Sequence, residues 1–173
     1  MSQRTPVFFN TVIDATDSTT RISVAEYSAA EVIRQFLALY ACLDFKAELE
    51  EIGVKPFQFL RRTKILRELR ALCIALWGLA LQKSFPNNAR EFFEEFRASA
   101  PMLSGQDKES LELANRINIY IDLFNPKKDT DFLPVADYLA EVLALDATDR
   151  ARLRLKLSLI IRNLYTLIFN KLV

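Results

Sequence analysis

The sequence predicts an all-α protein, a single-domain bundle of about six helices with an extended N-terminal arm. Only three glycines occur among the 173 residues, and the six prolines lie at the edges of segments. Between these breaks, apolar residues recur at helical spacing in stretches rich in Ala, Leu, Glu, Arg and Lys, which favour helix. A chain of this length is also large enough to bury one hydrophobic core.

The predicted arm comprises residues 1–22, and the helical bundle domain comprises residues 23–173. The arm contains the stretch TPVFFNTVI, which is apolar and rich in residues that favour extended structure. We therefore expect an extended segment that packs on the bundle, either in its own subunit or in a neighbouring one.

The first helix is expected to begin near Val24, because Ser23 and Glu26 have the spacing of a capping box. It should continue to Ile52, since Gly53 is a residue that commonly follows the end of a helix.

The second helix is expected to have Pro56 in its first turn and to reach about Ser84, so that the first two helices form a long antiparallel hairpin. In such a hairpin Cys42 and Cys73 would be offset by roughly 13 Å along the helix axis. That offset exceeds the Cα separation of about 7 Å that a disulfide tolerates. Both cysteines are therefore expected to be buried thiols in a reducing compartment.

Three shorter helices should follow, each beginning at polar capping residues. The first runs to about Ser99 and the second to about Phe124. Pro134 falls in the first turn of the third. The expected capping residues are Asn87 or Asn88 for the first, Ser104 with Asp107 for the second, and Asp131 for the third.

The closing segment, ARLRLKLSLIIRNLYTLIFNKLV, at first alternates charge and leucine as a strand would. However, Leu, Arg and Lys favour helix, and Asp146 and Asp149 precede the segment, where a helix N-terminus favours negative charge. We therefore predict a helix and expect it to be the most buried element. Its main apolar face would consist of Leu153, Leu157, Ile160, Ile161, Leu164, Ile168 and Leu172.

This last helix has a second apolar side, opposite the first, that indicates a second neighbour. The side consists of Leu155, Leu159, Phe169 and Val173. It is either covered by the other helices and the arm, or it binds another subunit with Arg152, Lys156 and Arg162 as a charged rim. Core packing is the default interpretation of an apolar stripe.

Residues that many enzymes need are absent from the sequence. There is no histidine, which excludes Ser–His and Cys–His nucleophilic catalysis and the histidine-containing zinc and di-iron sites. The 23 basic and 22 acidic residues nearly cancel, so no overall field favours nucleic acid or an anionic membrane. We expect no cofactor, no nucleic-acid partner and no membrane partner. In the absence of a signal peptide or membrane-spanning stretch we expect a cytoplasmic location.

Carboxylates alone can hold Mg²⁺, which leaves a carboxylate–magnesium hydrolase as one enzymatic hypothesis. Acidic residues are also common on solvated helix faces, and spacing alone does not make acidic pairs converge. We therefore assign no metal ligand. The Glu-x-x-Glu spacing occurs at Glu48/Glu51, Glu91/Glu94 and Glu109/Glu112.

A stripe of small residues in the second helix has two interpretations. It consists of Ala71, Ala75, Gly78 and Gln82. Together with Trp77 it would line a groove for a small apolar ligand. Alternatively, it permits a close helix–helix crossing, which is the default.

Two further features suggest contacts with a partner. The segment RRTKILRELR, residues 61–70, carries five positive charges and fits a solvated face that pairs with acidic neighbours or with an acidic protein. Phe93, in REFFEEF, lies about 100° around the helix from Phe92 and is a candidate anchor for a partner.

The leading functional hypothesis is therefore a non-enzymatic interaction or regulatory protein that acts through helix surfaces as a homodimer, or with another protein. The alternative is a module that binds a small apolar ligand near Trp77, and the third is the carboxylate–magnesium hydrolase.

Overall fold

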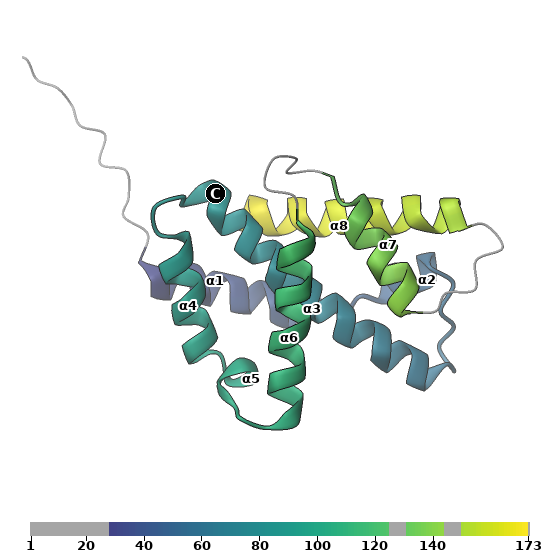
Figure 1. Ribbon diagram of the computed structural model, residues 1–173, viewed down its shortest axis with the longest axis horizontal. Helices are drawn as coiled ribbons and strands as arrows, with labels where there is room; N and C mark the ends of the chain where they lie inside the picture. Colours follow the sequence, from purple (N-terminus) through teal and green to yellow (C-terminus); the bar gives the residue numbers. More distant parts are fainter. Residues whose placement is uncertain (1–27, 125–130, 144–149, 173) are drawn as a thin grey trace, which may run out of the picture.

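The computed structural model describes residues 28–124, 131–143 and 150–172 (Figure 1). These residues form a helical bundle without strands, which confirms the all-α class. The predicted arm and the predicted cap at Ser23 and Glu26 lie outside the described residues. The helices are α1 (Ala29–Cys42), α2 (Lys46–Glu51), α3 (Phe59–Ser84), α4 (Ala89–Ser99), α5 (Pro101–Ser104), α6 (Lys108–Leu123), α7 (Leu133–Val142) and α8 (Arg150–Leu172).

Helix α3 is the central element. In Figure 1 it runs diagonally through the molecule, with α6 crossing in front of it and α8 along the top. Residues 71–81 are all buried, because this stretch is apolar on every side and α4, α6 and α8 pack around α3. The expectation that the last helix is the most buried element is therefore wrong, since α3 contains fourteen buried residues and α8 contains six.

The first predicted helix is interrupted, which is one reason why the described residues contain more helices than expected. Helix α1 ends at Cys42, and the chain turns through Leu43 and Asp44. Phe45 follows with a left-handed φ of 54° and is buried in the core. Asp44 Oδ1 accepts a hydrogen bond from the backbone N–H of Lys46 at 3.0 Å. Burial of a large aromatic side chain outweighs the weak helix propensities of these residues.

The expected hairpin between the first two long helices is also wrong. Helix α1 packs against α4 and α8, and Phe36 projects from it onto Trp77 of α3. The two rings stack with centroids 4.5 Å apart and planes inclined by 12°. Helix α3 begins at Phe59 rather than near Pro56, because residues 55–58 form a turn.

The two cysteines are free and differ in exposure. Cys73 is buried in α3, as expected. Cys42 is exposed, so the expectation of a buried thiol is wrong there. Cys42 is the last residue of α1, where the chain leaves the bundle core before Phe45 returns to it.

The ends of the shorter helices largely follow the predicted signals. Helix α4 begins after Asn88 and ends at Ser99, and α7 has Pro134 in its first turn. The cap of α6 is Asp107, whose Oδ1 accepts a hydrogen bond from Ser110 N at 2.9 Å. Ser104 does not share this role, because it ends the short helix α5.

The closing segment is a helix, as predicted, and its main apolar face lies against the bundle. Its buried residues are Leu157, Ile160, Ile161, Leu164, Ile168 and Leu172, and Leu153 is half-buried. None of the helices within the described ranges has the length and apolar character needed to cross a membrane.

Candidate functional site

The predicted second side of α8 divides into an exposed part and a core part. Leu155 and Leu159 are exposed, with 59% and 52% of their surface accessible. Phe169 is half-buried and packs against the core beside Tyr165, with ring centroids 5.9 Å apart. Val173 lies outside the described residues.

The exposed leucines lie among basic side chains of the same helix. Leu155, Leu159, Arg152 and Arg162 are all exposed and project from neighbouring turns; we name these four residues the α8 ridge. Lys156, also predicted for the rim, instead ties α8 to α2, because its Nζ donates a hydrogen bond to the backbone oxygen of Glu51 at 3.2 Å.

Helix α8 is covered on the side of its main apolar face, whereas the ridge belongs to its exposed side. Helices α1, α3 and α7 pack against α8. Arg154 Nε lies 3.0 Å from Asp137 Oδ1 of α7, and this ion pair fixes the first turns of α8. The described residues of the chain therefore leave an apolar pair of leucines flanked by cations.

The small-residue stripe of α3 contributes both to close packing and to a groove. A groove of about 700 Å³ lies between α3, α4 and α6, and Ala75, Gly78 and Gln82 form part of its wall. Phe93 packs directly on Gly78, where a Cβ atom would lie 3.1 Å from its Cε2 atom. Phe124, at the end of α6, also lines the groove. This volume is in the range of small-molecule sites.

Two of the residues predicted for an apolar ligand site lie in the core. Trp77 is fully buried between Phe36 and Phe96, with centroids 4.5 and 4.8 Å from its ring. Ala71 is fully buried as well. Phe93 lies between the core and the groove, because its ring centroid is 5.9 Å from that of Trp77 and its side chain also lines the groove. The predicted anchor Phe93 is thus half-buried against its own chain.

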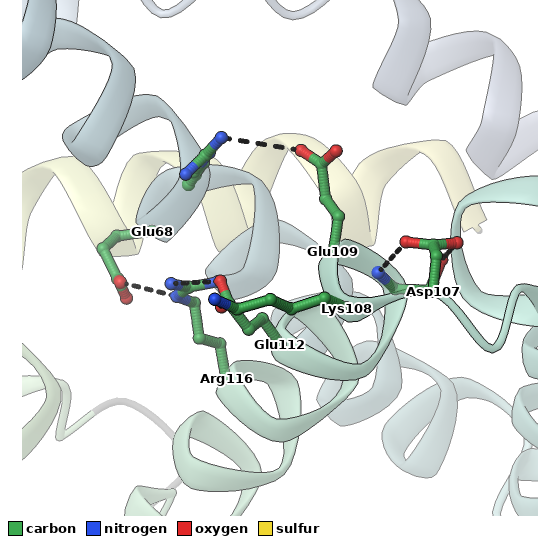
Figure 2. A network of polar contacts seen from close by, with 8 residues as sticks. Glu68, Asp107, Lys108, Glu109, Glu112 and Arg116 are labelled. Atoms are coloured by element: carbon green, nitrogen blue, oxygen red, sulfur yellow. Dashed lines mark hydrogen bonds and ion pairs between the residues drawn. The ribbon is translucent and has the colours of Figure 1, made fainter.

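A polar network joins α3 to α6 (Figure 2). Glu68 is buried, and its Oε1 accepts a hydrogen bond from Arg116 Nε at 2.9 Å. Its Oε2 accepts a hydrogen bond from the hydroxyl of Tyr120 at 2.8 Å. Arg116 Nη2 also lies 3.4 Å from Glu112 Oε2. Both oxygens of Glu68 are therefore satisfied, and the carboxylate ties the two helices together.

Burial governs the ionisation of the tyrosines near this network. Burial and the adjacent Glu68 carboxylate raise the pKa of Tyr120 far above its ordinary value, so this hydroxyl stays a hydrogen-bond donor. Burial likewise raises the pKa of Tyr138, whose ring meets that of Tyr120 edge-on at 5.5 Å. Burial raises the pKa of Tyr40 to about 12.

A second cavity, of about 590 Å³, opens beside this network between α3 and the start of α6. Its charged lining is mixed in sign. Arg67 Nη2 lies 3.7 Å from Glu109 Oε1, and Lys108 Nζ lies 3.9 Å from Glu112 Oε1. This pairing fits the interpretation of residues 61–70 as a solvated face with acidic neighbours.

The predicted acidic pairs do not converge. Glu48/Glu51, Glu91/Glu94 and Glu109/Glu112 lie on α2, α4 and α6, respectively. Glu94 pairs with Arg90 at 2.8 Å, and Glu109 and Glu112 pair with cations as described above. Within residues 28–124, 131–143 and 150–172 no group of three or more potential metal-ligating side chains occurs.

One feature of the sequence indicates the buried network. It is easily missed, because Glu68 lies within the basic segment of residues 61–70, which was interpreted as a solvated face. Glu68 lies three residues after Ile65 and four before Leu72, which places it on an apolar face of α3. Arg116 and Tyr120 are four residues apart on α6 and share a face. A lone carboxylate at a core position indicates a buried partner, although the partner itself cannot be read from the spacing.

Comparisons of the chain with protein-family models, with curated proteins and with solved structures gave no match.

Proposed function

We propose that this protein is a non-enzymatic interaction protein that works through the α8 ridge, with a second copy of the chain as its partner. The observation that carries the proposal is the exposure of two neighbouring leucines, Leu155 and Leu159, on a helix whose main apolar face is buried in the bundle. A twofold arrangement would present the same leucines from both subunits. Such an interface needs about 800 Å² per partner, so it extends beyond the leucines to Arg152 and Arg162.

The proposal predicts the effect of a charge at the ridge. Burial of one leucine side chain stabilises an interface by about 2 kcal/mol, and a twofold interface contains each leucine twice. Leu155→Glu or Leu159→Glu should therefore weaken the dimer by roughly 4 kcal/mol, or about a thousandfold in Kd. Light scattering after size exclusion, across a dilution series, should show a dimer that becomes a monomer, while circular dichroism keeps its helical signal.

Leu111→Glu is the matched control, because Leu111 is an exposed leucine on α6, away from the ridge. This variant should leave the dimer intact. A wild-type chain that remains monomeric at every concentration contradicts the homodimer. Loss of helicity in the α8 variants would assign Leu155 and Leu159 to the core instead.

A second candidate function is supported by the groove beside Gly78, which would accept a small apolar ligand. Trp77 is the only tryptophan and contacts Phe93, so a ligand that displaces Phe93 should change tryptophan fluorescence. Titration with decanoate tests this proposal. Gln82→Phe, at an exposed position of the groove wall, would narrow the groove without touching the Phe93–Trp77 contact and should weaken the response, and Leu111→Ala should keep it. An unchanged wild-type signal would argue against the ligand.

A further inference from the structure

The start of α3 presents an exposed apolar tip. Phe57, Phe59 and Leu60 have 68%, 74% and 91% of their surface accessible. In Figure 1 the first turn of α3 lies near the right-hand end of the long axis of the molecule. We name the segment from Lys55 to Lys64 the α3 tip. Neither the groove beside Gly78 nor the cavity beside the Glu68 network is lined by a residue of the α3 tip.

The tip is held in its shape by local hydrogen bonds. Gln58 N donates to the backbone oxygen of Lys55 at 3.1 Å, and Lys55 N donates to Gln58 Oε1 at 3.1 Å. Pro56 occupies the second position of this turn, which its fixed φ favours. Phe57 is therefore presented at a preorganised turn, and Phe59 and Leu60 follow in the first turn of α3.

Cations flank these apolar residues in the sequence, and acidic residues are absent from the tip segment. The segment KPFQFLRRTK contains Lys55, Arg61, Arg62 and Lys64 and no Asp or Glu. None of these four cations forms an ion pair within the part of the chain that the structure describes. The Lys55 Nζ atom instead lies 5.9 Å from the centre of the Phe57 ring.

We propose that the α3 tip binds the surface of an anionic lipid bilayer. Phe57, Phe59 and Leu60 would enter the boundary between headgroups and acyl chains, and the cations would contact headgroup phosphates and carboxylates. A protruding tip of aromatic residues and cations fits a fluid, flat surface, whereas a protein helix binds in a groove. This proposal differs from the expectation of no membrane partner. It is compatible with the observed fold, because binding to a membrane surface requires no spanning helix.

The test uses the full chain and sedimentation with vesicles. We expect binding to vesicles of phosphatidylcholine with about 30% phosphatidylserine, and much weaker binding to phosphatidylcholine alone. The variant with Phe57→Ser, Phe59→Ser and Leu60→Ser should bind at least about tenfold more weakly, because its apolar anchor is lost. Lys64→Glu should reduce binding by at least about fivefold.

Matched controls lie on α6, away from the tip. Leu111→Ser and Lys108→Glu replace an exposed leucine and an exposed lysine and should bind as the wild type does. Circular dichroism should show the same melting temperature for all variants, because the replaced side chains are exposed. Phe57→Trp adds a second tryptophan, whose emission should shift to the blue and be quenched by brominated lipid.

Three results would overturn the proposal. The first is no sedimentation of the wild type with the anionic vesicles, and the second is equal binding by the serine variant. The third is a loss of self-association in the serine variant, which would assign the tip to a protein interface. The α3 tip and the α8 ridge contain different residues. A failure of the vesicle-binding prediction can therefore be distinguished from a failure of the homodimer prediction, which is measured by oligomeric mass.

Discussion

Cys73 and Cys42 have the same side chain in opposite environments. Cys73 lies in the fully buried stretch of α3, and burial raises its thiol pKa from 9.0 to about 12. Cys42 is exposed at the end of α1. The free energy of unfolding should therefore depend on pH through Cys73.

The sign of this dependence follows from proton binding. Between pH 9.0 and about 12 the unfolded chain loses the Cys73 proton while the folded chain keeps it. The stability that this thiol contributes is therefore fully present below pH 9.0 and is lost as the pH rises toward 12. Cys73→Ala should make the slope of stability against pH shallower by up to about 1.4 kcal/mol per pH unit.

Urea unfolding at a series of alkaline pH values measures this slope. Cys73→Ala also leaves a cavity, but its cost is the same at every pH and does not affect the slope. Ser158→Ala, at a position on α8 that does not titrate, is the matched control and should keep the wild-type slope. Equal slopes for Cys73→Ala and the wild type would contradict the prediction.

At the scale of elements, the pair of Glu68 and Arg116 decides how α3 and α6 meet. Their side chains are 5% and 27% exposed, and they differ in their remaining partners. Arg116 has Glu112 as a second partner, whereas Glu68 would keep only the Tyr120 hydroxyl. Removal of Arg116 therefore affects Glu68 more strongly than removal of Glu68 affects Arg116.

This asymmetry predicts a difference between two single substitutions. Arg116→Met leaves a buried carboxylate without its cation and should lower the free energy of unfolding by about 3 kcal/mol. Glu68→Leu leaves Arg116 with water and Glu112, but it also removes the acceptor of the buried Tyr120 hydroxyl. In a Tyr120→Phe background, which has no such hydroxyl, Glu68→Leu should therefore cost at least about 1 kcal/mol less than Arg116→Met. The double variant in that background should recover part of the loss, since an apolar pair needs no compensation.

Urea denaturation at neutral pH measures all three variants, and Arg90→Met provides the control. Arg90 and Glu94 form an exposed pair on α4, so this substitution should change stability by less than about 1 kcal/mol. In the Tyr120→Phe background, a larger loss for Glu68→Leu than for Arg116→Met would contradict the proposed role of burial.

Across the described residues of the molecule, five of the seven exposed large apolar side chains belong to the α3 tip and the α8 ridge, and the other two are Leu111 and Leu167. Helices α3 and α8 both begin at the right-hand end of Figure 1. The α3 tip comprises the turn before α3 and its first residues, and the leucines of the α8 ridge lie in the first half of α8. The groove beside Gly78 lies instead between α3, α4 and α6. The two proposed surfaces are thus separate from the candidate ligand site.

Local sequence signals determined the fold class and most helix ends. Asp107 and Pro134 act on the backbone of their immediate neighbours, so their effect is visible in the sequence. The helical state of α8 was also predictable, because the period of its apolar face is a property of the segment itself.

Packing between distant parts of the chain sets which helix is central and which apolar residues remain exposed. Helices α3 and α8 are both apolar on more than one side, so periodicity alone allows either to occupy the centre. The long-range contacts of α3 with α4, α6 and α8 bury Trp77 and leave Leu155 and Leu159 in solvent. The Glu68–Arg116 pair depends in the same way on residues distant in sequence, because burial is a property of the packed chain.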